Sequence, residues 1–347
     1  MSTEPAPSRI LVRCPNPVGD AVMATPALRA LRRAQPQAEI TLLGPASHAG
    51  LLNGLDSFDH FLPIRSKGLG EALARMRALR ARRFDWALLL PDSPRVALEA
   101  WLAGARRRAG YARDPLRRRL LSERIEPPLE QGRRMPFSMI ERYLRITRLF
   151  GAADAGKTLD LRVDAGAAER VAARLASLGL QPAERLLLVA PGAAFGPSKL
   201  WPARHFARAC DLLQRRFGLV PVLVVAPNDE EIRIAREVAS HAQERCISLA
   251  DTKGDLEDLK ALVDAAALLV CNDTGARHVA VALERPVITL MGPTDPRHTH
   301  HLLERQRVLY EPVECRPCGR PTCPIDHRCL VGLPPERVVE AAAELLA

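Results

Sequence analysis

Four short stretches of the chain combine residue types that could do chemistry, and the first is the loop at residues 15–20 (PNPVGD). Two prolines and a glycine fix the loop, and Asp20 opens the helix that follows it. A carboxylate here can accept backbone N–H bonds as a helix cap, or it can act as a general base. The sequence leaves both interpretations of Asp20 open. No G-x-G-x-x-G is present, so the dinucleotide fingerprint is absent.

The second stretch, residues 191–202 (PGAAFGPSKLWP), could hold a phosphate. Gly192 and Gly196 allow a ligand to come close to the backbone. Lys199 adds a positive charge just before a helix that we expect to begin at Pro202. The alternative is a lysine that only meets solvent. The stretch lacks the GK[ST] of a Walker A motif.

The third stretch, residues 272–278 (NDTGARH), places a predicted helix start at Thr274 or Gly275. The free N–H groups and positive dipole end of that helix could bind a diphosphate without a metal. Asp273 is a candidate cap for the helix. His278 lies one turn further on, on the side of Thr274, and a packed histidine is the alternative to a ligand contact.

The fourth stretch holds four sulfurs within 15 residues, at Cys315, Cys318, Cys323 and Cys329, with His327 between the last two. The C-x-x-C start is typical of zinc sites, but the second pair is spaced x5 rather than x2. Three interpretations stay open: a structural metal site, a thiol-rich closing loop, and a redox role.

Each of the first three stretches follows an almost continuously apolar run, as a strand covered on both faces would be. Strands are predicted at residues 9–14, 39–44, 85–91, 186–190, 220–226, 267–272 and 287–291, and helices at 166–178, 202–217 and 335–347. This alternation predicts an α/β protein with two doubly wound domains joined near residues 155–168. Ligands in such folds sit beyond the carboxyl ends of the strands, and we expect the site in a cleft between the domains.

The composition of the chain excludes several classes of protein. The chain has 347 residues, 47% hydrophobic and 26% charged, which excludes disorder, collagen and coiled coil as the main state. No apolar run of about 20 residues occurs, and the first residues do not form a secretory signal, so a cytoplasmic location is expected. Residues 1–165 hold 28 Lys and Arg against 17 Asp and Glu, whereas residues 166–347 hold 22 against 23.

The excess of arginine in the first half indicates either an ordinary solvated surface or an anionic partner. With only 4% aromatic residues and no binding motif within the basic runs, a nucleic acid is not expected. A phosphate-rich membrane face fits the charge. On this interpretation Arg106, Arg107 and Arg108 would help to dock the anionic partner.

Three of these strings, VGDAVMATPALRALRR, PGAAFGPSKLWPARHFARA and CNDTGARHVAVALERPVITLMGPTDP, together resemble the glycosyltransferase family 9 heptosyltransferases of lipopolysaccharide core synthesis. The string FGPSKLWP is most similar to the enzymes that add the second core heptose, and the cysteine-rich stretch resembles a tail of many members. The resemblance covers nearly the whole chain. It implies a GT-B fold, with residues 1–160 binding the acceptor, residues 166–334 binding the ADP-sugar, and the helix at 335–347 crossing back to the first domain.

The resemblance also implies an inverting, metal-independent transfer of heptose from ADP-heptose to a heptosyl-Kdo–lipid A acceptor, at the cytoplasmic face of the inner membrane and without a cofactor. Asp20 would be the catalytic base. Lys199 would contact the diphosphate, and the rest of the donor site would be formed by Gly192, Asp273, Thr274, Gly275 and His278. The acidic residue expected after residues 220–226 has two candidates, Asp229 and Glu230. Heptosyltransferase I, another family 9 transferase and a non-catalytic binding module are the alternatives.

Overall fold

The computed structural model describes residues 6–66, 68–130, 133–299 and 304–347, and the chain divides into two compact units, Met1–Asp160 and Leu161–Ala347. Each unit holds a six-stranded sheet whose neighbouring strands are all parallel. Their strand orders, β3-β2-β1-β4-β5-β6 and β11-β10-β9-β12-β13-β14, have the same winding, which is that of the doubly wound dinucleotide-binding fold. The predicted α/β class is confirmed.

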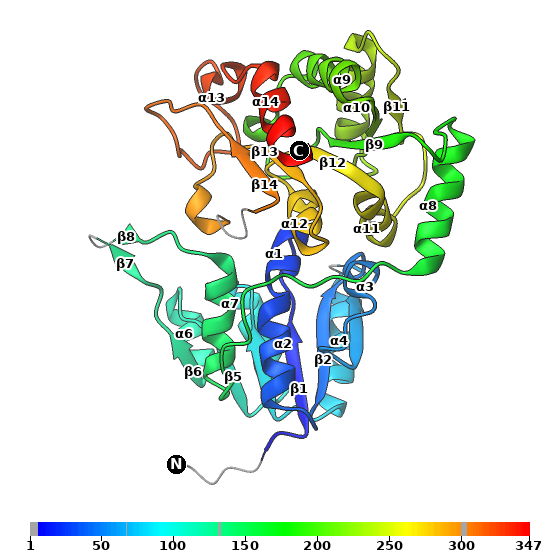
Figure 1. Cartoon of the computed structure of the whole chain (residues 1–347). Coiled ribbons are helices and arrows are strands. Elements are labelled where there is room, and N and C mark those ends of the chain that lie inside the picture. The colour runs from blue at the N-terminus through cyan, green and yellow to red at the C-terminus, as the bar shows by residue number, and fades with distance from the viewer. Residues whose placement is uncertain (1–5, 67, 131–132, 300–303) are drawn as a thin grey trace. The chain divides into compact units, whose positions relative to one another are not determined.

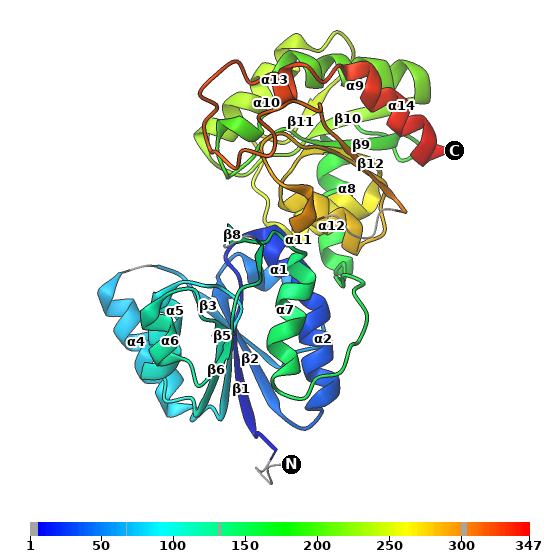
Figure 2. The same cartoon turned by 90° about the vertical axis from the view of Figure 1, so that its left-hand side faces the viewer.

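In the first unit the sheet lies between two layers of helices, with α4, α5 and α6 on one face and α2 and α7 on the other (Figure 2). The strands are β1 (Arg9–Arg13), β2 (Glu39–Pro45), β3 (His60–Ile64), β4 (Trp86–Leu89), β5 (Arg107–Tyr111) and β6 (Glu123–Ile125). The helices are α1 (Val18–Met23), α2 (Thr25–Ala34), α3 (His48–Leu52), α4 (Leu69–Ala81), α5 (Pro94–Leu102), α6 (Pro115–Leu120) and α7 (Met139–Arg148). A short hairpin, β7 (Leu129–Glu130) and β8 (Arg133–Arg134), precedes α7.

The second unit repeats this plan (Figure 1). Its strands are β9 (Arg185–Ala190), β10 (Leu219–Leu223), β11 (Ile247–Ser248), β12 (Ala266–Asn272), β13 (Val287–Leu290) and β14 (Gln306–Leu309). Its helices are α8 (Ala165–Ser177), α9 (Ala203–Phe217), α10 (Asp229–His241), α11 (Leu256–Ala265), α12 (Gly275–Ala282), α13 (Arg328–Val331) and α14 (Pro335–Leu346), with 3-10 turns η1 (Pro197–Lys199) and η2 (Pro296–His298). The central strands are buried along their length, because helices cover both faces.

The terminal helix α14 packs within the second unit, against α9 and β14. Its apolar face, Val338, Val339, Ala341 and Ala342, is part of the hydrophobic core of that unit. That residues 335–347 also cross back to the first domain, as the resemblance implies, stays a prediction.

The arginines at 106–108 do not form a docking surface as a group. They lie at the amino-terminal end of β5, and in a parallel sheet this is the edge opposite the one where ligands bind. The Arg107 guanidinium stacks on the rings of Trp86 and Phe150 and bonds Glu123. Arg108 donates to the backbone carbonyls of Leu120 and Ala105. The prediction that this triplet docks an anionic partner is therefore wrong for Arg107 and Arg108, because they hold the unit together.

Candidate functional site

The carboxylate of Asp273 is the centre of a charged cluster in the second unit. Asp273 directly follows β12 and is 8% exposed. Lys199 Nζ lies 2.6 Å from its Oδ2, and the Thr294 hydroxyl donates to the same oxygen at 2.7 Å. Arg277, one turn into α12, lies 3.5 Å from Oδ1. Burial alone would raise the pKa of Asp273, but the two cations outweigh it and lower the pKa to about 2.

Lys199 reaches Asp273 from the loop that follows β9. The turn η1 presents its side chain, which also donates to the backbone carbonyl of Asp273 at 3.1 Å and lies over the Phe195 ring. The interpretation of Lys199 as a merely solvated lysine is therefore wrong. Its side chain is 13% exposed, and the ammonium group is held at the start of α12. A fixed cation beside a helix N-terminus is an arrangement that suits a phosphate.

The N-terminus of α12 lies where the sequence predicted it. The helix begins at Gly275 after an N-cap at Thr274, and the Thr274 side chain makes no capping bond. Asp273 is thus not the cap, because its carboxylate is engaged by Lys199 and Thr294. The His278 side chain is buried, at 4% exposure, as the packed-histidine alternative required. Thr274 and Gly275 are partly exposed, so the first amides of the helix are accessible to a ligand.

Asn272, the last residue of β12, forms hydrogen bonds with the segment that follows β9. Its side chain is fully buried, with Oδ1 accepting from the Trp201 amide at 3.1 Å and Nδ2 donating to the Pro191 carbonyl at 2.6 Å. The loop after β9 is therefore bonded to the end of β12 at two points, one on either side of Lys199. These bonds fix the path of the backbone from which Lys199 extends.

Glu231, in the first turn of α10, lies against the loop that follows β9. The sequence offered its two neighbours, Asp229 and Glu230, as candidates for an acidic residue here, and did not single out Glu231. A Cβ added to Gly192 would lie 2.1 Å from Glu231 Oε2, so the absent side chain leaves room for this carboxylate. The same Oε2 accepts the Ala226 amide at 2.8 Å. Asn228 caps α10 by accepting the Glu231 amide, and an Asn three residues before a Glu is the signal that could have found it.

Asp20 lies in the first unit, at the third residue of α1 and half-buried. The N-cap of α1 is Pro17, and no side chain caps the helix, so the interpretation of Asp20 as an N-cap is wrong. Arg13, at the end of β1, braces the loop between this strand and α1. Its buried guanidinium donates to the carbonyl of Cys14 and to the Asn16 side chain. The loop that leads into α1, and so to Asp20, is thus fixed at the carboxyl edge of the first sheet.

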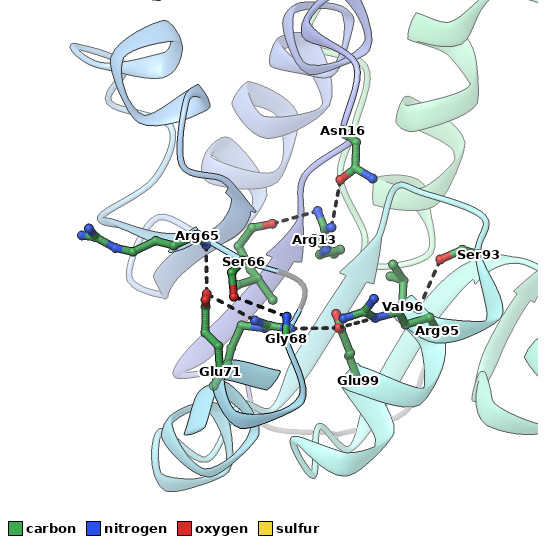
Figure 3. Close-up of polar contacts among 12 residues, drawn as sticks. Arg13, Asn16, Arg65, Ser66, Gly68, Glu71, Ser93, Arg95, Val96 and Glu99 are labelled. Carbon is green, nitrogen blue, oxygen red and sulfur yellow. Dashed lines mark hydrogen bonds and ion pairs between the residues drawn. The ribbon is translucent and has the colours of Figure 1, made fainter. Parts of the chain in front are cut away.

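Other arginines line the same edge of the first sheet (Figure 3). Arg75 of α4 is 9% exposed and lies between Glu71 and Glu99, and Arg95 joins Glu99 at 3.3 Å. The Nε and one terminal nitrogen of Arg75 are buried without a hydrogen-bond partner. The first turn of α5 begins here as well, where Ser93 caps it by accepting the Val96 amide. This set of guanidinium groups beside a helix N-terminus can bind an anion.

All four cysteines of the cysteine-rich stretch have free thiols. Cys315 and Cys318 are exposed, and Cys329 is buried. Within the described ranges, no group of three or more His, Cys, Asp or Glu side chains is arranged to hold a metal ion. The same part of the chain contains no helix that is both long and apolar enough to cross a membrane.

The low pKa of Asp273 predicts an acid-sensitive contribution to stability. The folded pKa is about 2 and the unfolded value is 3.8, so the ionised carboxylate stabilises the fold by about 2 kcal/mol above pH ~4, and this is lost as the pH falls toward 2. Denaturant unfolding of wild type and Asp273→Asn should show a stability difference that is constant above pH ~5 and shrinks below pH ~4. A difference that does not change with pH would contradict the ion pair.

Comparisons with known proteins show the family to which this chain belongs. The family model "Glycosyltransferase family 9 (heptosyltransferase)" matches residues 72–328. Lipopolysaccharide heptosyltransferase 2 of Salmonella typhimurium is 30% identical, over 98% of this chain and 99% of that protein. The solved structure of Escherichia coli ADP-heptose LPS heptosyltransferase II is 28% identical with a TM-score of 0.80, covering 97% of this chain and 98% of that one. A family 9 structure from Veillonella parvula has the same fold, with a TM-score of 0.82 at 22% identity and coverage of 98% and 97%. The chain therefore belongs to glycosyltransferase family 9, the heptosyltransferases, and is an enzyme with the GT-B fold.

Proposed function

We propose that this enzyme is a heptosyltransferase II, which transfers L-glycero-D-manno-heptose from ADP-heptose to the heptosyl-Kdo–lipid A inner core of lipopolysaccharide. The observation that carries the proposal is the fixed Lys199 cation beside the N-terminus of α12, because it provides a site for a nucleoside diphosphate. The names of the Salmonella and Escherichia coli relatives support the choice of donor and acceptor.

The donor diphosphate binds at Lys199 and at the first amides of α12, with Thr274 and Gly275 facing its oxygens. Asp273 holds Lys199 in place, and the side chain of His278, in the same helix, is buried. Glu231, seated against Gly192, is the carboxylate that accepts the ribose hydroxyls, as acidic residues beyond the second strand of doubly wound domains do.

The reaction is a single displacement with inversion. Asp20 removes the proton from the acceptor hydroxyl, whose oxygen then forms a bond to the anomeric carbon from the face opposite ADP. The bond between that carbon and the β-phosphate oxygen breaks, and ADP leaves with the electron pair. Lys199 and the amides of Thr274 and Gly275 stabilise the negative charge that develops on the β-phosphate. This is the charge that a metal ion neutralises in other transferases, so no metal or cofactor is required.

The acceptor carries carboxylates and phosphates, and the arginines at the carboxyl edge of the first sheet are suited to them. At this edge Arg75 and Arg95 share the carboxylate of Glu99, and Glu71 lies 3.8 Å from Arg75. The planar guanidinium can bond two oxygens of a carboxylate or phosphate at once. Asp20 lies at the same edge, so the acceptor and the base belong to the same unit.

We place the enzyme at the cytoplasmic face of the inner membrane, bound through the layer of α4, α5 and α6. Five of the exposed large apolar side chains of the chain belong to this layer: Leu73, Leu98, Trp101, Leu102 and Leu116. The same three helices also carry exposed arginines, which are Arg77, Arg80, Arg95, Arg118 and Arg119. Exposed Trp and Leu with a basic surround favour an interface with anionic lipid.

The decisive experiment is a mass-spectrometric assay of purified enzyme with ADP-heptose and a mono-heptosylated Kdo–lipid A. One heptose should be added, and Asp20→Asn should lose at least ~10²-fold in turnover while it retains its fold and ADP binding. Transfer only to an acceptor that lacks heptose would identify a heptosyltransferase I instead. If no sugar nucleotide is turned over, the chain is a binding module, and a near-wild-type rate for Asp20→Asn would remove that residue as the base.

Lys199→Ala should weaken ADP binding by about 10- to 150-fold, because a charge-assisted bond to phosphate contributes roughly 1.5–3 kcal/mol. Calorimetry with ADP measures the change, and the exposed Lys253→Ala serves as a matched control that should bind ADP normally. EDTA should leave transfer intact. Unchanged ADP affinity in Lys199→Ala would remove this lysine from the donor site.

The membrane surface can be tested without any acceptor. Of the three tryptophans, Trp86 and Trp201 are buried and Trp101 is 52% exposed, so acrylamide quenching reports mainly on Trp101. Vesicles that contain phosphatidylglycerol should protect Trp101 from acrylamide, whereas pure phosphatidylcholine should not. Leu98→Ser with Trp101→Ser should reduce vesicle co-sedimentation about tenfold, and Leu178→Ser, in the second unit, should not. Dimerisation through this layer in place of vesicle binding would contradict the assignment.

A further inference from the structure

The segment at residues 316–330, which contains most of the cysteine-rich stretch, makes contacts that the proposed chemistry does not use. We call it the clamp segment. It touches the loop that carries Lys199 and the loop that carries Thr294, and both of these side chains hold the Asp273 carboxylate. The clamp segment therefore joins the two loops that complete the charged cluster.

Its contacts with the first loop converge on Ser198, the residue immediately before Lys199. Ser198 is 2% exposed, and the clamp segment bonds each of its polar groups. The Ser198 amide donates to the Pro321 carbonyl at 3.1 Å, and its hydroxyl donates to the Arg320 carbonyl at 2.6 Å. The His327 Nε2 lies 2.7 Å from the Ser198 carbonyl, and because a carbonyl only accepts, the imidazole is the donor.

Its contacts with the second loop fall on Gly292 and Pro293, which follow β13. Arg316 Nε donates to the Gly292 carbonyl at 2.8 Å, and the Gly319 amide donates to the Pro293 carbonyl at 2.9 Å. Thr294 is the next residue. A Cβ added to Gly292 would lie 2.9 Å from the Leu330 side chain and 3.2 Å from the Ser198 carbonyl, so the three segments meet at van der Waals distance.

His327 is the residue of the clamp segment whose side chain makes the bond to the Lys199 loop. Its backbone is left-handed, at φ 57°, which is uncommon for a residue with a side chain. Such a conformation costs free energy and persists where the surroundings impose it. Here it turns the chain into α13 while the imidazole points back to Ser198.

We propose that His327 is a positioning residue for the transfer reaction, which fixes the Ser198 carbonyl and thereby places the Lys199 ammonium group for the donor diphosphate. The proposal rests on the proposed donor role of Lys199. The role belongs to the imidazole and to the backbone of the clamp segment, and the exposed thiols of Cys315 and Cys318 take no part in it.

Calorimetric titration of His327→Ala with ADP tests this assignment. A loss of folded protein would lower the measured stoichiometry of binding, whereas a misplaced Lys199 would raise the dissociation constant of the protein that is folded. The loss of one hydrogen bond should weaken ADP affinity about 3- to 10-fold at unchanged stoichiometry. His327→Gln, whose amide nitrogen can reach the same carbonyl, should restore the affinity to within about 2-fold. Cys315→Ser with Cys318→Ser is the matched control within the same stretch and should bind ADP as wild type does.

The double variant Lys199→Ala, His327→Ala shows whether His327 acts through Lys199. If it does, adding His327→Ala to Lys199→Ala should change ADP affinity no further. Additive losses, unchanged affinity in His327→Ala, or a loss in the cysteine control would each overturn the positioning role. Unchanged affinity in Lys199→Ala alone would instead overturn the donor-site proposal, so the two failures are distinguishable.

Discussion

The ion pair between Lys199 and Asp273 is the interaction on which the second unit's site depends. Taking a carboxylate and an ammonium group out of water is costly, and a buried pair is often less stabilising than an apolar one. Here a single carboxylate faces two cations, Lys199 and Arg277, and the hydroxyl of Thr294. The cluster therefore keeps a surplus positive charge beside the N-terminus of α12. A dianionic diphosphate is the kind of ligand that this surplus attracts.

The first unit has a larger surplus of positive charge, but its arginines fall into two groups. One group forms bonds within the fold, and the other lies at the edge of the sheet where ligands bind. Arg107 and Arg108 bond backbone carbonyls and stack on rings at the amino edge of the sheet. Arg75 and Arg95 lie at the carboxyl edge, where they share the carboxylate of Glu99. Net charge counted along a sequence cannot separate an arginine that braces the fold from one that meets a ligand. Position along a parallel strand separates them, because the two ends face opposite edges.

The sequence predicted most of the central strands, since β1, β2, β9 and β12 are apolar runs that stop at turn residues. It did not predict β3 or β5, whose HFLPI and RRAGY resemble loop or surface sequences. Lys199 and the start of α12 were predicted because local motifs encode them. Glu231, Thr294 and His327 were not, since each reaches its partner across the fold.

The glycines of the loop after β9 have close neighbours from distant segments that the sequence does not reveal. Gly192 and Gly196 were expected to let a ligand approach the backbone. In the structure, protein atoms occupy that space: Glu231 lies against Gly192, and the Pro321 carbonyl would be 2.6 Å from a Cβ on Gly196. Gly196 also has φ 142°, a conformation that favours glycine. The glycines thus let distant segments pack onto the loop, and it is this packing that sets where Lys199 stands.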